Sequence, residues 1–213
     1  MENVPPDIIA DFRIILNRFS RMVSGIPEQD PGENRRRLDA LCVEIARCTA
    51  CPLPADGIRL TASGDISASI LIVDKNGSLL TSSDARELLY RMFDAINIDK
   101  ESLYLTTVYK CRPNSPAGPL QPPSCTQFLD RELRLIEPLA ICALGEDTAA
   151  ALSGSFRDMS LIHGQKMSYR GIPLFAIRHP LFLLDNPEYK KETWSDLQIF
   201  RNYYRKAACR VLS

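Results

Sequence analysis

The chain has 213 residues, 45% of them apolar, and its 26 basic and 26 acidic side chains give a formal net charge of zero. This length predicts one domain with an extension, and the apolar share is enough for a sizeable core. Zero net charge argues against general coating of a polyanion, although it leaves room for a local basic face. No apolar run predicts a membrane span or a secretory signal, so the expected location is cytoplasmic.

An amphipathic helix is predicted at the start of the chain, because Ile8, Phe12 and Phe19 recur at helical spacing. The polar segment that follows is rich in proline and glycine, as is typical of a linker. We therefore assign residues 1–35 to an amino-terminal helical extension and linker, and residues 36–213 to the main domain. The extension could bind a protein partner.

Strands and helices alternate along the main domain. The predicted strands are SILIVD (69–74), LYLTTVY (103–109), LAICAL (139–144) and IPLFAI (172–177). The predicted helices cover residues 38–45, 87–96, 125–136, 146–152 and 193–207, with a capping box at Asp84 and Glu87 before the second of them. Such alternation predicts an α/β fold, with a parallel sheet between helices on both faces.

In a parallel sheet, ligands bind beyond the carboxyl ends of the strands. Asp74, Lys75 and Asn76 follow the first predicted strand, and Arg178 and His179 follow the last one. Asp74 or Asn76 could hold a water molecule for general-base chemistry. The alternative is a plain turn, which the Asn-Gly dipeptide at this point favours.

Four of the seven cysteines lie at the edges of predicted elements. Cys48 and Cys51 form a CxxC at the end of a helix, and Cys111 and Cys125 flank a proline-rich loop. A CxxC can close a redox disulfide, although that motif normally starts a helix rather than ending one. Zinc sites usually take two close pairs, whereas the loose second pair fits an iron–sulfur cluster at least as well. Unrelated buried thiols are the remaining alternative.

The segments RCTACPLP, SILIVD, LYLTTVYKCRP, LAICALG and IRHPLFLL, together with Cys125, follow one another in a recognisable order. In this order and spacing the chain, from about Leu38 to Arg205, resembles the iron–sulfur (family 4) uracil-DNA glycosylases. The resemblance implies a three-layer α/β/α sandwich with a four-stranded parallel sheet. It also implies that one [4Fe–4S] cluster is bound by the four cysteines Cys48, Cys51, Cys111 and Cys125.

The resemblance further implies a pocket for a base flipped out of DNA, in which the N-glycosidic bond is hydrolysed. Lys75 stands near the place of the family's water-positioning Glu, and Thr107 stands in place of its base-reading Asn. Leu80 or Thr81 lies nearest to the place of the stacking Phe, and His179 matches the family's histidine. The expected catalytic residues are therefore His179, Asp74 and Asn76, and the expected base-binding residues are Thr107, Leu80 and Thr81.

DNA contacts are expected around the same site. Leu183 or Leu184 could wedge into the duplex, and Arg178, Lys110 and Arg112 could bind phosphates. The sequence thus predicts an atypical DNA glycosylase with altered or low activity. The alternatives are a non-catalytic relative that binds nucleic acid or protein, and a cluster-bearing protein unrelated to DNA.

Overall fold

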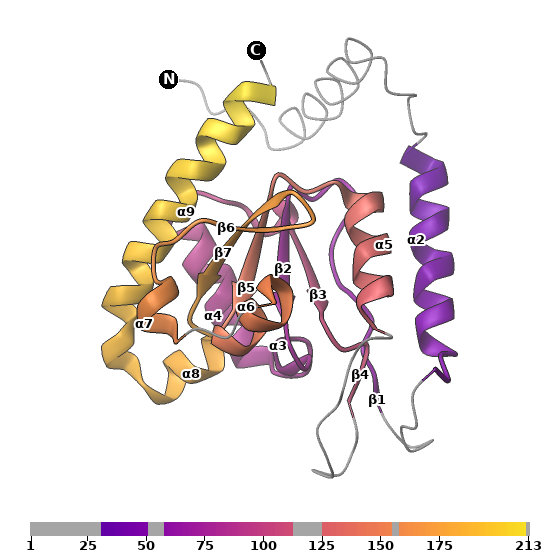
Figure 1. Cartoon of the computed structure of the whole chain (residues 1–213), viewed down its shortest axis with the longest axis horizontal. Helices are drawn as coiled ribbons and strands as arrows, with labels where there is room; N and C mark the ends of the chain where they lie inside the picture. Colours follow the sequence, from indigo (N-terminus) through magenta and orange to yellow (C-terminus); the bar gives the residue numbers. More distant parts are fainter. Residues whose placement is uncertain (1–30, 51–57, 113–124, 155–157, 212–213) are drawn as a thin grey trace.

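The computed structural model describes residues 31–50, 58–112, 125–154 and 158–211, and the predicted amino-terminal helix lies outside these residues. Within them, five strands form one sheet in the order β3-β2-β5-β7-β6 (Figure 1). The strands are β2 (Ile70–Asp74), β3 (Leu103–Thr107), β5 (Ala140–Leu144), β6 (Met167–Tyr169) and β7 (Ile172–Ile177). Strands β3, β2, β5 and β7 are parallel, which confirms the predicted four-stranded parallel sheet. The unpredicted β6 is antiparallel to β7 and forms one edge.

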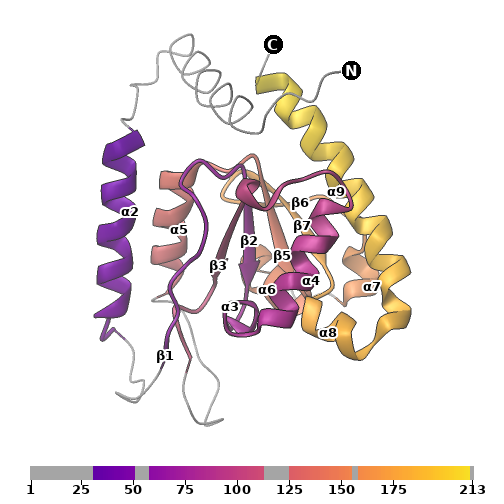
Figure 2. The ribbon, with the colours of Figure 1, turned by 180° about the vertical axis from the view of Figure 1, so that it is seen from behind.

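Helices cover both faces of the sheet, so the three-layer prediction is also confirmed (Figures 1 and 2). The helices are α2 (Pro31–Ala46), α3 (Ser78–Thr81), α4 (Ser83–Asp94), α5 (Thr126–Ile136), α6 (Glu146–Ser153), α7 (Met159–Ile162), α8 (Pro180–Asp185) and α9 (Lys190–Val211), with short 3₁₀ turns η1 (Lys100–Ser102) and η2 (Pro187–Tyr189). None of the helices in the described ranges combines the length and apolar character needed to cross a membrane.

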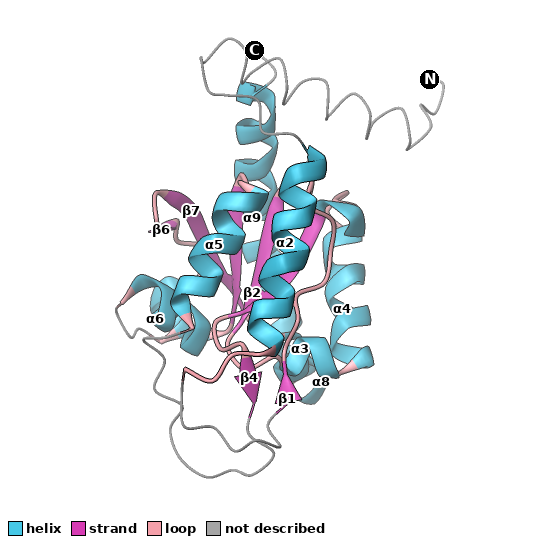
Figure 3. Ribbon diagram, turned by 90° about the vertical axis from the view of Figure 1, so that its right-hand side faces the viewer, coloured by secondary structure: helices cyan, strands magenta, loops and turns pink. Residues whose placement is uncertain are grey.

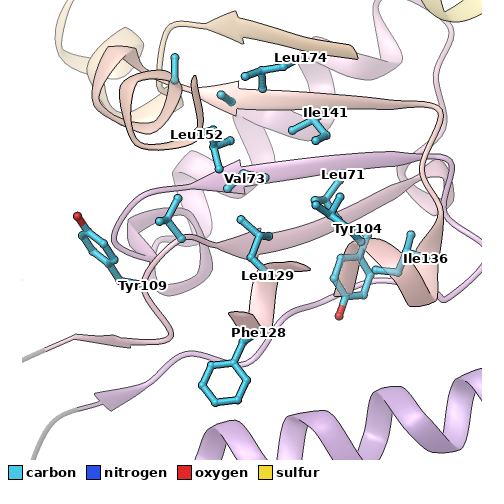
Figure 4. Packing of buried hydrophobic residues seen from close by; sticks show 14 of the residues in the cluster. Leu71, Val73, Tyr104, Tyr109, Phe128, Leu129, Ile136, Ile141, Leu152 and Leu174 are labelled. Carbon is cyan, nitrogen blue, oxygen red and sulfur yellow. The ribbon is translucent and has the colours of Figure 1, made fainter. Parts of the chain in front are cut away.

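The sheet is buried on both faces because side chains alternate along each strand. Leu71 and Val73 of β2 point into the cluster that also contains Phe128 and Leu129 of α5 (Figure 4). Ile70 and Ile72 belong to the opposite cluster, which includes residues of α4 and α9. All five residues of β2 are buried. A short, continuous apolar run is the pattern expected of such a strand.

Two helix starts differ from the sequence prediction. Helix α2 begins at Pro31, inside the segment assigned to the linker, and proline suits a first helical position because it lacks the N–H that would have no partner there. Helix α4 is capped by Ser82, whose side chain accepts a hydrogen bond from the Ala85 N–H, rather than by the predicted Asp84.

A second, two-stranded ribbon pairs β1 (Ile58–Arg59) antiparallel with β4 (Cys111–Arg112). It extends from the same end of the sheet as α3 and α8 (Figures 1 and 3). Cys48 lies two residues beyond the end of α2, and Cys125 caps the start of α5. The carboxyl end of the sheet therefore holds both groups of residues that the sequence singled out.

Candidate functional site

Asp74 ends β2 as a buried carboxylate, with 3% of its surface exposed. One of its oxygens, Oδ2, accepts hydrogen bonds from the Leu79 N–H at 2.9 Å and the Ser78 hydroxyl at 3.0 Å. The other oxygen, Oδ1, accepts a longer bond from the Asn76 N–H at 3.4 Å and lies 3.5 Å from Nε2 of His179. The carboxylate thereby holds the turn after β2 in one conformation.

Gly77 makes this turn possible. Its φ of 73° lies in the left-handed region that favours glycine, and an added Cβ would stand 2.3 Å from Cδ1 of Leu60. The predicted Asn-Gly turn is therefore present, and it serves to bring Ser78 back onto Asp74. The turn that the Asn-Gly dipeptide predicted thus also fixes the position of the Asp74 carboxylate.

His179 caps helix α8, which follows β7, and its Nδ1 accepts a hydrogen bond from the Leu181 N–H at 3.1 Å. In a neutral ring the proton then resides on Nε2, because an accepting nitrogen carries none. That Nε2 lies 3.1 Å from the Ser78 hydroxyl oxygen and 3.5 Å from Asp74 Oδ1. His179 therefore faces the Asp74 turn across the sheet edge, as the sequence led us to expect.

The three side chains Asp74, Ser78 and His179 do not form a nucleophile relay. Ser78 donates its proton to Asp74 and accepts one from His179, so the imidazole is the donor to the hydroxyl and not its base. The arrangement instead presents one imidazole N–H and one fixed negative charge at the carboxyl edge of the sheet. Ser78 was not predicted as a site residue. The sequence feature that could have indicated it is its place four residues after Asp74, at the start of a helix.

The pKa of Asp74 is lowered from its ordinary value. Burial alone would raise it, but the hydrogen bonds from His179, the Leu79 N–H and the Ser78 hydroxyl together outweigh desolvation. Asp74 is consequently ionised at neutral pH despite its position in the interior.

Other residues predicted for the pocket are placed differently. The Asn76 side chain is exposed, and Lys75 forms an ion pair with Asp147 at 3.1 Å. Thr107 is buried at the end of β3 and donates its hydroxyl proton to the Tyr109 carbonyl at 2.7 Å. A base reader at Thr107 would have to use the remaining acceptor lone pairs.

The short helix α3 carries the two residues nearest to the expected stacking position. Leu80 is half-buried against the core cluster on the α4 side of the sheet. Thr81 is exposed, and its hydroxyl donates to the Gly77 and Ser78 carbonyls. Neither residue supplies an aromatic surface for a base.

Helix α8 corrects one of the predicted DNA contacts. Leu183 is 1% exposed and packs in the core, so it is not available to enter a duplex, whereas Leu184 is 43% exposed. Arg178 forms an ion pair with Glu192 at 2.8 Å, and its guanidinium lies over the Tyr189 ring at 4.2 Å. A phosphate at Arg178 would therefore compete with Glu192.

The predicted phosphate contact of Lys110 is also wrong. Lys110 was expected to bind phosphate, but its ammonium is buried and lies 2.6 Å from Glu132 Oε2, which is equally enclosed. Because the Lys110 ammonium is enclosed in the protein and paired with Glu132, it cannot contact a DNA phosphate. Arg112 lies in β4, and its side chain falls outside the described residues.

Three of the four framework cysteines lie in the described residues. Cys48 follows α2, Cys111 is in β4 and Cys125 precedes α5. Cys51 lies outside the described part, within which no group of three or more His, Cys, Asp or Glu is arranged to hold a metal ion.

Comparison with known proteins defines the class. The model of the uracil DNA glycosylase superfamily matches residues 68–198, and the chain therefore belongs to that superfamily.

Similar curated relatives are Type-4 uracil-DNA glycosylases. That of Thermotoga maritima is 27% identical over 190 residues, covering 79% of this chain and 95% of the relative. That of Archaeoglobus fulgidus is 28% identical over 180 residues, covering 76% of this chain and 90% of the relative. A third, from Sulfurisphaera tokodaii, is 24% identical over 183 residues, covering 77% of this chain and 83% of the relative. The sequence resemblance is thus confirmed at the level of the family.

Proposed function

We propose that this chain is an atypical iron–sulfur glycosylase that hydrolyses the N-glycosidic bonds of damaged bases in DNA with altered or low activity. The observation that carries the proposal is the Asp74–Ser78–His179 cluster at the carboxyl edge of the sheet. Membership of the superfamily and the names of the Type-4 relatives support DNA as the partner and base excision repair as the setting.

The chemistry needs a flipped base to leave with its bonding electrons while water adds to the sugar carbon. Negative charge develops on the base, and a hydrogen-bond donor in a poorly solvated site stabilises it. His179 Nε2–H is the donor within reach of the sheet edge, and ionised Asp74 keeps the proton on that nitrogen. Leu184, exposed on the same α8 helix, would fill the gap left in the duplex.

The same contacts are the physical reason for expecting low activity. Nε2–H already points to Ser78 and Asp74, so the ring must leave them before it can serve a base. Thr107 likewise donates its proton within the protein. These internal bonds also favour the second candidate, a non-catalytic relative that binds nucleic acid or protein.

Uracil excision is therefore expected to be about 100-fold or more slower than that of a Type-4 enzyme assayed beside it, the typical cost of a missing charge-stabilising donor. The assay uses single- and double-stranded oligonucleotides carrying uracil, hypoxanthine or xanthine, and measures abasic sites and retained DNA. A uracil rate equal to that of the comparator would contradict the proposal of low activity. DNA retention with no abasic site from any base would establish the second candidate.

His179→Asn is the informative variant in this assay. Asparagine is a good helix cap and its amide oxygen can still accept the Leu181 N–H, whereas its shorter side chain cannot place an N–H at the position of Nε2. Excision should fall at least tenfold with little change in melting temperature, while His179→Ala should also lose about 1 kcal/mol through the missing cap. An active Asn variant would show that the imidazole is structural.

We further propose that Cys48, Cys51, Cys111 and Cys125 bind one [4Fe–4S] cluster. The donor chemistry fits, since the three described members are cysteines beside the ends of α2, β4 and α5. A buried guanidinium nitrogen of Arg59 without a hydrogen-bond partner among the described residues also belongs to a side chain that is bonded to Cys48 and pairs across the ribbon with Cys111. When bound, the cluster would supply a covalent link between these elements, and it takes no part in base hydrolysis.

Replacing Cys111 or Cys125 with serine should remove most of the iron and inorganic sulfide from anaerobically purified protein and lower its melting temperature. Serine is a poor ligand for iron–sulfur centres, which are normally held by thiolates. Cys209→Ser is the matched control, because Cys209 is an exposed thiol outside the framework and should leave both contents unchanged. Stoichiometric zinc without sulfide would contradict the cluster.

A further inference from the structure

Arg59 lies opposite Cys111 in the β1–β4 ribbon, with the two Cα atoms paired across the strands. In an antiparallel pair, residues directly opposite each other project their side chains to the same face. The Arg59 side chain and the Cys111 thiol therefore leave the ribbon on one side. The two strands that carry them extend from the same end of the sheet as α3 and α8 (Figure 3).

The guanidinium of Arg59 also reaches the end of α2. Its Nη2 donates a hydrogen bond to the Cys48 carbonyl at 3.0 Å. One side chain thus connects the first cysteine of the CxxC to the ribbon that carries Cys111. Arg59 is thereby tied to two of the proposed cluster ligands, to Cys48 by a hydrogen bond and to Cys111 by strand pairing.

The second terminal nitrogen of this guanidinium, Nη1, is buried and has no hydrogen-bond partner among the described residues. Arg59 also forms no ion pair with a carboxylate in that part of the chain. Native proteins rarely leave a buried donor unsatisfied, and less often still one that carries a charge. The described residues supply no acceptor for this cationic N–H, and an anionic group at that place would satisfy both its hydrogen bond and its charge.

We infer that Arg59 is a positioning residue for the iron–sulfur cluster, donating Nη1–H to one of its sulfur atoms while Nη2 holds Cys48. The inference rests on the cofactor proposed above. A cluster bound by four thiolates is anionic, and its sulfurs accept N–H hydrogen bonds that stabilise it and tune its reduction potential. Arg59 would therefore slow loss of the cluster and raise its potential.

The test compares Arg59→Met with wild type in the loaded, full-length protein. Loss of a hydrogen bond around a metal centre typically costs 10–100-fold in affinity, so the visible absorbance of the cluster should decay about tenfold faster with chelator present. The reduction potential should shift to a more negative value, because the reduced cluster carries the greater negative charge. The decay rate and the potential of Arg59→Lys should lie between those of wild type and Arg59→Met. Lysine keeps the positive charge, but its ammonium cannot bond the Cys48 carbonyl and the cluster sulfur with the geometry of a planar guanidinium.

Arg47→Met is the matched control. Arg47 is an exposed arginine directly before Cys48. The Arg47→Met substitution therefore removes the same charge near the same ligand, but it removes no buried donor. It should leave the decay rate and the potential unchanged. A loaded Arg59→Met protein with wild-type decay and potential would overturn the role of Arg59 alone. Absence of iron and sulfide from wild-type protein would overturn the cofactor proposal and this inference with it.

Discussion

Replacing Lys110 with methionine is expected to lower the free energy of unfolding by about 3–5 kcal/mol, the usual cost of removing one partner from a buried ion pair. Lys110 is 2% exposed and Glu132 is 1% exposed, and their charged groups lie 2.6 Å apart. The ammonium also donates to the Thr106 hydroxyl, which itself donates to Glu132. Methionine leaves the Glu132 carboxylate inside the protein without its cation.

A double variant distinguishes the effect of an unpaired buried charge from the effect of altered packing. Lys110→Met combined with Glu132→Leu removes both charges and should recover most of the lost stability, because an apolar pair of similar volume avoids the desolvation of either ion. Arg131→Met is the control on the same helix, since Arg131 pairs with Glu44 on the surface at 2.7 Å. Its loss should cost less than about 1 kcal/mol.

Urea unfolding measures all three variants. A Lys110→Met protein that unfolds at the wild-type urea concentration would show that the buried pair contributes nothing to stability. The expected large effect has a structural consequence, because Lys110 precedes Cys111 and Glu132 belongs to α5, whose start carries Cys125. The ion pair therefore fixes two of the proposed cluster ligands relative to each other.

The parallel sheet was predictable because its strands are short, mostly apolar runs that the fold buries largely or completely. β2 and β5 have every residue buried, and a parallel sheet between helices is the usual setting for such runs. Strand β6 was not predicted, since two of its three residues are only partly buried, the third is exposed, and all three pair with β7. The local sequence pattern of such a short strand does not indicate which strand it pairs with.

The site was predictable in position but not in its contacts. The position of Asp74 and His179 at strand ends identified both residues. They are about a hundred residues apart in the chain, but β2, β5 and β7 are parallel neighbours in the sheet, so their carboxyl ends lie close together. Lys110 was misplaced because lysine is almost never fully buried without a partner, and Glu132 gave no sign in the sequence of being that partner. Leu183 and Leu184 are neighbours, and only the packing of α8 decides which one is exposed.

Asp74→Asn should lower the free energy of unfolding by about 2–3 kcal/mol at pH 7, the range for hydrogen bonds made to a charged group. An amide offers one oxygen and one NH₂ group where the carboxylate offers two acceptors to Leu79, Ser78 and His179. One of these donors must then face another donor. Ser78→Ala is the control, because it removes one hydroxyl and keeps the charge, and it should cost less than half as much.

The difference between wild type and Asp74→Asn should also depend on pH, in a direction that the lowered pKa fixes. The folded protein holds this carboxyl below its ordinary pKa, so the unfolded chain takes up the proton first as the pH falls. The stabilisation is fully present above the unfolded pKa of about 4 and is lost as the pH falls through the folded value. Unfolding curves at pH 7 and at progressively lower pH should therefore converge for the two proteins below about pH 4. A gap that stayed constant with pH would mean that Asn destabilises through shape alone, and that Asp74 does not act at this site as a fixed negative charge.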